Sequence, residues 1–521
     1  MSSILTNNSA MVALQTLKTV NTDLQKTQGE ISTGKSVATA RDNSAVWAIS
    51  KVMESDVKGF KGISESLSLG ESTVAVARNA SETVTDLLTE VKGKIVAAQE
   101  ENVDRDKIQT DIDALRDQIT SVVNAAQFNG LNMVKGTEDV NILSSLDRSS
   151  SGDVSASNIT VNRQDLTSDA GTNGVGSGGN DLSGQILDAA SGGSAYAGGT
   201  LSANGNTAVI EFTQTTGWDA GDATTVTVAG QSVTYTSEAA DQTETNARDS
   251  LLSSLQALDL EGVSFAGNAG NQIEVTSTRA FDSLDISVSD SVSGGDGNSY
   301  FQSINGTATG GTTTETATID QRAEEVFFTS GASVAEGNSY QASIGGNAYF
   351  YTAGKGETFE DVARGLKTAI DSASIEGIST QVAVSDSGEA SLKIDNSGAD
   401  LSLATAAMDG GTASGGLFGL DAIDVSTDAG AESALDNVET LIQNSIDAAA
   451  AFGSAEGRIE TQSNFVSQLM DSLKSGIGTL VDANMEEASA RLQALQVQQQ
   501  LATQSLSIAN QAPQNILALF R

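Results

Sequence analysis

Residues 492–520 read LQALQVQQQLATQSLSIANQAPQNILALF and contain no Asp, Glu, Lys or Arg. The opposite end has the same property, because residues 1–17, MSSILTNNSAMVALQTL, are also free of charged side chains. Gln, Asn, Ser and Thr keep both stretches polar, while their apolar residues recur at helical spacing. Helices without charge on any face are expected to be buried against something. The fold therefore depends on what covers the two ends.

Further helices are predicted inward from the N-terminus. The first has an apolar stripe that reaches Ile31, and Gly34 is suited to end it. Residues 42–44 are good capping residues, so a second helix is expected to begin near Ala45 and to continue to about residue 95. Asp104 can cap a third helix, which ends before a turn at residues 128–130. Four glycines could interrupt the second helix locally: Gly59, Gly62, Gly70 and Gly93.

The C-terminal part mirrors this arrangement. Apolar stripes over residues 435–473 and 477–509 predict two more helices. The chain is too long for one hydrophobic core. The predicted fold class is a multidomain protein in which paired N- and C-terminal segments form an α-helical coiled-coil or bundle rod. A β-rich α+β region is inserted between them.

The middle region, residues 141–430, is acidic and has strand patterns. It holds 9 basic and 38 acidic residues, so it carries −29 of the total formal charge of −40. Alternating residues around a turn at 229–231 predict a hairpin, followed by a helix at 246–258 and strands near 272–276 and 284–288. The same order returns about 115 residues later, with its helix at 359–370. We therefore predict two repeated ββαββ-like units, at about 216–290 and 335–405.

The uncharged terminal helices are the candidate functional surface. A membrane span is a poor explanation because Gln498, its neighbouring glutamines and the many Ser and Thr residues are costly in hydrocarbon. The two helices could simply pair within one monomer, but this leaves their outer faces uncharged without a reason. Burial between copies of the chain explains both faces. The predicted polymerisation interface is Leu14, Leu17, Leu24, Ile31, Leu492, Leu495, Leu506, Ile508 and Leu519.

Composition excludes several classes of function. There is no His and no Cys, which removes imidazole-based catalysis, thiolate chemistry and the commonest metal ligands. The net charge of −40 disfavours nucleic acid as a partner and insertion into a membrane is not expected. Acidic pairs such as Glu324 with Glu325, or Glu360 with Asp361, could serve as acid and base, but adjacent carboxylates are more often solvated surface. We expect no catalysis, cofactor or metal.

Short motifs at both ends give the chain a resemblance to bacterial flagellins. They are ISTG at 31–34, RDNSA at 41–45, AI at 48–49, KGF at 58–60, QFNG at 127–130 and SIANQAPQNILALFR at 507–521. The resemblance covers roughly residues 1–140 and 431–521. It implies a structural subunit that polymerises into the extracellular filament of the bacterial flagellum for swimming motility. The middle units also look like the small inserts of some flagellins and hook-associated proteins.

The resemblance further implies domains and partners. Residues 1–43 with 482–521 would form the inner coiled-coil domain, 44–140 with 431–481 a helical rod, and 141–430 the exposed variable region. The main partner would be the chain itself, in a helical homopolymer. Other partners would be the flagellar type III export apparatus and an export chaperone, the filament cap and the hook-filament junction proteins.

One position departs from the family pattern. Residues 88–95 align with the region that contacts the flagellin-sensing innate receptor, and Glu90, beside Val91 and Lys92, stands where many flagellins carry arginine. The resemblance therefore implies weak recognition by that receptor.

Two other functions remain open from the sequence. A hook-filament junction protein would share the helical ends, although the match at both termini favours the filament subunit. A secreted surface adhesin would share the acidic middle but would not require uncharged helices at both extremes. An export signal of the cleavable kind is not evident at residues 1–8.

Overall fold

The computed structural model describes residues 7–149, 153–175, 182–187, 198–213, 218–239, 243–291, 298–309, 316–329 and 331–519, with side chains up to residue 511 in the last helix. The chain divides into two compact units. The terminal unit comprises Met1–Ala75, Asp139–Val161 and Phe452–Arg521, and the β-rich unit comprises Val76–Glu138 and Asn162–Ala451. The three-part domain division derived from the sequence stays a prediction.

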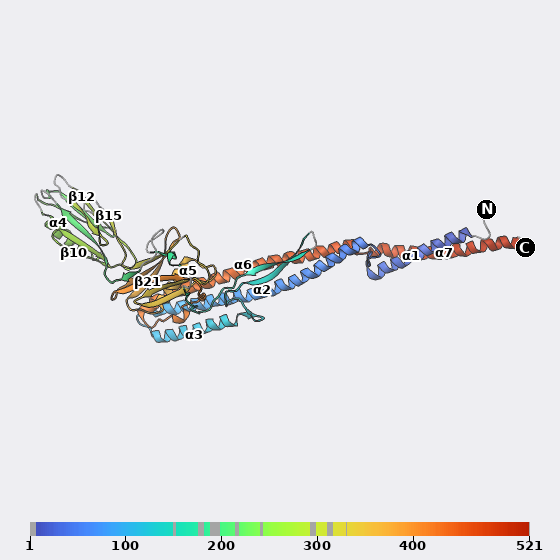
Figure 1. Cartoon of the computed structure of the whole chain (residues 1–521), viewed down its shortest axis with the longest axis horizontal. Coiled ribbons are helices and arrows are strands. Elements are labelled where there is room, and N and C mark those ends of the chain that lie inside the picture. Colours follow the sequence, from blue (N-terminus) through green and yellow to red (C-terminus); the bar gives the residue numbers. More distant parts are fainter. Residues whose placement is uncertain are drawn as a thin grey trace. The chain divides into compact units, whose positions relative to one another are not determined.

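The two ends of the chain pair in the terminal unit. Helix α1 (Asn8–Thr33) lies along helix α7 (Met485–Leu519), as Figure 1 shows. The helices are antiparallel, because Asn7 Nδ2 donates to the carbonyl of Ala509 at 2.8 Å and Gln499 Nε2 donates to Asn21 Oδ1 at 2.7 Å. At the far end of the pair, Lys35 forms a β-bridge with Asp482. The pairing of N- and C-terminal segments is thus confirmed.

Backbone hydrogen bonds fix the end of the helix pair. Gly34 ends α1 in the left-handed conformation, with φ at 69°, as its sequence position predicts. The chain after it bonds to the break that separates α6 (Asp428–Val481) from α7. The amide of Ser36 donates to the carbonyl of Val481 at 2.7 Å, and the amide of Ala483 donates to the carbonyl of Gly34 at 2.9 Å. The turn and the break therefore hold each other in place.

Helix α2 (Ser44–Ala98) is continuous, so the expected interruptions at its glycines do not occur. In the terminal unit, an antiparallel hairpin of β3 (Val140–Arg148) and β4 (Val154–Val161) packs against this helix instead. A Cβ added to Gly70 would lie 2.6 Å from Cδ1 of Ile142, and one added to Gly59 would lie 2.8 Å from Cδ1 of Leu146. Gly59 and Gly70 therefore provide space for the hairpin.

A helical bundle supports the β-rich unit. Within this unit, α2 and α6 run antiparallel, because Thr85 Oγ1 lies 3.0 Å from Ser445 Oγ, and Lys92 forms an ion pair with Glu439. Helix α3 (Arg105–Ala125), capped by Asp104 as predicted, packs beside them. The short strands β1 (Gln127–Phe128) and β2 (Leu131–Asn132) follow. Side chains buried in the bundle are Val84, Leu88, Val91, Ile95, Ile112, Ile119, Val438 and Leu441.

The first β-rich group consists of two antiparallel sheets and helix α4 (Glu244–Gln256). One sheet has the order β10-β11-β7-β13-β14 and the other β15-β12-β8-β9. The strands are β7 (Asn206–Thr213), β8 (Ala223–Val228), β9 (Gln231–Thr236), β10 (Val263–Asn268), β11 (Gln272–Ser277), β12 (Leu284–Ser291), β13 (Asn298–Ile304), β14 (Thr307–Ala308) and β15 (Thr316–Ile319). Phe212 and Phe301 from the strands and Leu251 from α4 belong to one core.

The second group repeats much of this pattern around helix α5 (Phe359–Asp371). Its sheets have the orders β19-β20-β16-β5 and β18-β17-β21-β6. The strands are β5 (Ile186–Leu187), β6 (Gly199–Leu201), β16 (Glu324–Phe328), β17 (Ser339–Ile344), β18 (Asn347–Thr352), β19 (Ile378–Val384), β20 (Ala390–Asn396) and β21 (Leu401–Met408). A separate core includes Tyr340, Leu366 and Ile394.

Strand pairing agrees between the two groups. In the first, β11 pairs with β7 and β12 with β8; in the second, β20 pairs with β16 and β21 with β17. The sequence-based units lacked β10 in the first group and β21 in the second, and they lacked the initial strands β7 and β16. Their interpretation as duplicated ββαββ units stays a prediction.

Candidate polymerisation surface

The inner face of the α1–α7 pair contains part of the predicted interface. Leu495 is 8% exposed, and Val20, Thr27 and Ala502 are similarly buried. We call the contact between the inner faces of α1 and α7 the inner seam. Five of the predicted residues are half-buried at its edges: Leu17, Leu24, Ile31, Leu492 and Leu506. The structure therefore uses these six predicted residues at least partly to pair the two helices within one chain.

The outer face keeps apolar side chains exposed. Two of the predicted residues lie there, since Leu14 is 57% and Ile508 is 68% exposed. Four further residues were not selected from the sequence because they lie off the main stripes: Met11, Val12, Val497 and Leu501, each at least 55% exposed. Leu519 is the remaining predicted residue, and its side chain lies outside the described ones. The signal that could have identified the outer residues is the absence of charge around the whole helix.

A shallow groove of about 870 Å³ runs between the two helices on the exposed side. Its floor and walls combine apolar side chains with neutral polar ones, and no charged residue lines it. The lining residues are Asn8, Ser9, Val12, Ala13, Thr16, Val20, Gln498, Leu501, Ala502, Ser505, Ile508 and Ala509. Such a surface accepts a helix of similar composition without burying an unpaired charge.

Comparisons with known proteins agree with this architecture. The bacterial flagellin N-terminal helical region matches residues 4–139, and the C-terminal helical region matches residues 435–520. Over 526 aligned residues, the chain is 31% identical to Flagellin B and 30% identical to Flagellin A of Rhizobium meliloti, and both alignments cover 100% of each chain. The chain belongs to the bacterial flagellin family.

Membership confirms the main expectations from the sequence. The helical ends around a β-rich middle are those of a flagellin, and the chain is a structural subunit of the extracellular flagellar filament that polymerises with itself. The family is structural rather than catalytic. In the described part of this flagellin, no helix is both long and apolar enough to cross a membrane.

Among solved structures, the chain is similar to FlgL of Xanthomonas campestris. It is 12% identical with a TM-score of 0.29, and the alignment covers 82% of this flagellin and 98% of FlgL.

The predicted receptor region lies on α2 in the β-rich unit. Val91 is fully buried, and Lys92 forms the ion pair with Glu439. Glu90 is exposed. Of the three residues, Glu90 is the exposed one whose side chain forms no hydrogen bond or ion pair with the described residues of another helix, and it is therefore the most accessible to a protein partner of the flagellin monomer.

The acidic pairs that the sequence offered as acid and base have structural contacts. Glu360 pairs with Arg364 at 2.7 Å, and Asp361 accepts hydrogen bonds from Thr358 at the start of α5. Glu325 accepts a hydrogen bond from Ser391 at 2.6 Å, and burial raises the pKa of Glu324. Among the described residues, no group of three or more His, Cys, Asp or Glu side chains could hold a metal ion.

Proposed function

We propose that this flagellin polymerises through the outer face of the α1–α7 pair, by placing the terminal helices of neighbouring copies in and beside the groove. The observation that supports this most directly is the exposure of Leu501 and Ile508 beside a groove without charge. A chain of net charge −40 repels its own copies, and this surface avoids adding to that repulsion.

The magnitude of apolar burial favours a polymer over an isolated dimer. Complete burial of one large apolar side chain contributes about 1.5–3 kcal/mol. The outer face exposes six such side chains by a little more than half, so covering all of them contributes about 5–10 kcal/mol. Association costs about 4–15 kcal/mol in lost freedom. One contact between two copies is therefore marginal, whereas a lattice in which each subunit has several neighbours is stable.

Folding of the ends is coupled to assembly in this proposal. A two-helix pair with an exposed apolar face is marginally stable alone, and binding to neighbours stabilises it by mass action. Export before folding, through the flagellar type III apparatus with a chaperone, followed by assembly beneath a filament cap, would fit this behaviour. The chain has no Cys and one Pro, which is compatible with rapid refolding outside the cell.

The proposal includes the absence of enzymatic activity, since the chain lacks His and Cys and the acidic pairs are used in ion pairs, caps and hydrogen bonds. The other candidates are a hook-filament junction protein and a surface adhesin. Neither requires extensive self-assembly of purified protein, which separates them from a filament subunit experimentally.

The test is electron microscopy of purified protein under salting-out conditions, with Leu501→Asp compared against Leu501→Met. Leu501 is 58% exposed, so neither change disturbs the inner seam. We expect filaments from the wild type and Leu501→Met but none from Leu501→Asp, because burying an unpaired carboxylate costs several kcal/mol. A truncation lacking residues 1–35 and 493–521 should also fail to assemble.

The opposite outcomes are equally informative. Filaments from Leu501→Asp or from the truncated chain would place the polymerising surface elsewhere. Failure of the wild type to assemble would favour the junction-protein or adhesin function.

A further inference from the structure

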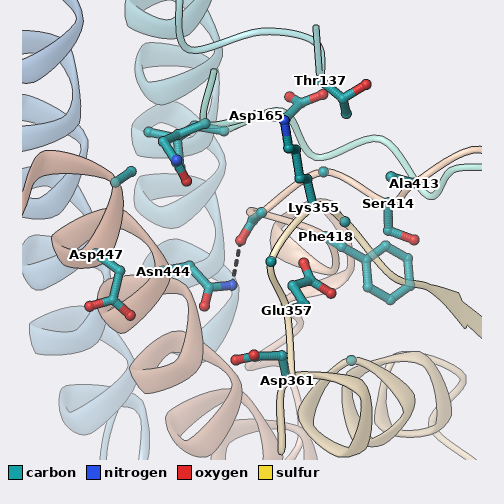
Figure 2. Close-up of a pocket in the computed structure, with 18 of the residues that line it drawn as sticks. Thr137, Asp165, Lys355, Glu357, Asp361, Ala413, Ser414, Phe418, Asn444 and Asp447 are labelled. Carbon is teal, nitrogen blue, oxygen red and sulfur yellow. Dashed lines mark hydrogen bonds between the residues drawn. The ribbon is translucent and has the colours of Figure 1, made fainter. Parts of the chain in front are cut away.

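The β-rich unit contains a polar cavity of about 220 Å³ between helices α5 and α6 (Figure 2). Asp361, Gly365 and Thr368 line it from α5. The residues that line it from α6 are Thr440, Leu441, Asn444, Asp447 and Ala448. The loop that precedes α5 forms another wall and carries Glu357. Asn444 Nδ2 closes one side by donating to the carbonyl of Gly416 at 2.8 Å.

Glu357 is the central acidic group of this cavity. Its Oε1 accepts a hydrogen bond from Tyr351 Oη at 2.9 Å, whereas its Oε2 is buried and has no hydrogen-bond partner. Burial raises the pKa of Glu357 to about 7; hydrogen bonds from the Gly354 backbone and from Tyr351 lower it, and the nearby charge of Asp361 raises it. A buried carboxyl group with one unpartnered oxygen is more stable neutral than ionised.

The charges around Glu357 also disfavour its ionised form. Four acidic side chains line the cavity, Asp165, Glu357, Asp361 and Asp447, against the two basic residues Arg163 and Lys355. Asp361 lies on α5 and Asp447 on α6. Figure 2 shows the Lys355 side chain extending away from Glu357 toward Asp165, and the Asp361 carboxylate close to Glu357. Arg163 Nη1 donates to the carbonyl of Lys135 at 3.4 Å. Ionised Glu357 would thus add a negative charge beside Asp361, in a cavity that Asp165 and Asp447 also line.

We propose that Glu357 acts as a proton-dependent clasp in this cavity. Neutral Glu357 holds the loop at residues 354–358 closed between α5 and α6, and loss of its proton loosens that loop. In the closed state the Tyr351 hydroxyl donates to Oε1 of Glu357, and the buried Oε2 of Glu357 has no hydrogen-bond partner. The clasp is separate from the polymerisation surface, because its residues lie in the β-rich unit.

The direction in which pH changes loop opening follows from the difference between the pKa of Glu357 in the open loop and in the closed loop. In the open loop Glu357 is solvated and has the ordinary pKa of 4.5, whereas in the closed loop the pKa is about 7. The closed loop is therefore fully stable below pH 4.5, and opening becomes about tenfold more favourable per pH unit up to pH 7. Above pH 7 the equilibrium constant for loop opening no longer changes with pH, and it is about 300-fold higher than at low pH.

Hydrogen exchange of the full-length monomer, read by mass spectrometry at peptides covering residues 354–366, tests the clasp. Wild type and Glu357→Gln are compared at the same pH, which cancels the intrinsic exchange rate and the effects of pH on every group other than residue 357. We expect exchange in the wild type, relative to Glu357→Gln, to rise about 60-fold between pH 5.0 and pH 7.5. Glu360→Gln is the matched control: its carboxylate is 43% exposed and paired with Arg364, so it should follow the wild type.

A second variant keeps the test decisive if Glu357→Gln does not fold. Tyr351→Phe retains the ring but removes the hydroxyl that stabilises the ionised carboxylate, so the pH at which exchange levels off should rise by about one unit. A pH-independent ratio between wild type and Glu357→Gln would overturn the clasp, as would an equal effect of Glu360→Gln or an unchanged plateau pH in Tyr351→Phe. These measurements use monomers, so their failure leaves the polymerisation proposal unaffected.

Discussion

Replacing Gly70 by alanine should destabilise the helices of the terminal unit, although the same change at Gly62 of α2 should stabilise them. Alanine is favoured over glycine in a helix interior by about 0.8–1.0 kcal/mol. At Gly62 a new Cβ meets no atom within 4 Å, so Gly62→Ala should gain this amount in full. At Gly70 the new Cβ would lie 2.6, 2.8 and 3.0 Å from three carbon atoms of Ile142.

The steric term at Gly70 outweighs the propensity term. Forcing an extra methyl group into a packed contact costs about 1–3 kcal/mol. After the helix-propensity gain, Gly70→Ala should lose up to about 2 kcal/mol. The two alanine variants should therefore differ by about 1–3 kcal/mol in the free energy of unfolding, with Gly62→Ala the more stable.

Urea unfolding of the monomer, followed by far-UV circular dichroism, measures this difference. Ile142→Val removes the Cδ1 atom nearest to the new Cβ, so it should partly rescue Gly70→Ala while costing about 0.5–1.5 kcal/mol in the wild type. A double-mutant cycle isolates that coupling. If Gly70→Ala stabilises the protein as much as Gly62→Ala does, the hairpin does not pack on α2 as described and the reasoning is refuted.

Three further predictions concern the β-rich unit. Asp395→Asn should destabilise it by about 3–5 kcal/mol in thermal unfolding, because Asp395 is 3% exposed and receives two hydrogen bonds from Arg322, at 2.7 and 2.8 Å. Gly365→Ala should lower the melting temperature by several degrees, since its Cβ would lie 2.3 Å from the ring of Tyr351, and a neutral result would contradict the packing of α5. Glu90→Arg should raise the response of innate-receptor reporter cells to purified monomer, whereas strong stimulation by the wild type would refute the prediction of weak recognition.

Local signals in the sequence located most helix boundaries. Gly34 ends α1 with a positive φ, Asn43 accepts a hydrogen bond from the amide of Val46 at the start of α2, and Asp104 caps α3. These predictions succeeded because capping depends on residues within one turn of the helix end. The glycines of α2 do not interrupt the helix, and Gly59 and Gly70 leave room for a hairpin distant in the sequence, which side-chain patterns near them do not encode.

The middle region was only partly predictable. Helix α5 was expected at residues 359–370 and is observed at Phe359–Asp371, supported by its capping box. Strand β10 was missed because four of its six residues are exposed, which leaves little alternation to detect. The pairing of β7 with β11 joins segments about 60 residues apart, and such register depends on tertiary contacts.

The sequence by itself determined that the two ends are uncharged helices that must be covered, since charge and periodicity are properties of single segments. Only the tertiary structure decided which apolar side chains cover each other within the chain and which remain outside, as with Leu495 and Leu501 on the same helix. The acidity of the middle region could likewise be read from its composition, but the raised pKa of Glu357 could not. Its pKa depends on burial and on the nearby charge of Asp361, and only the fold buries the side chain in this surrounding.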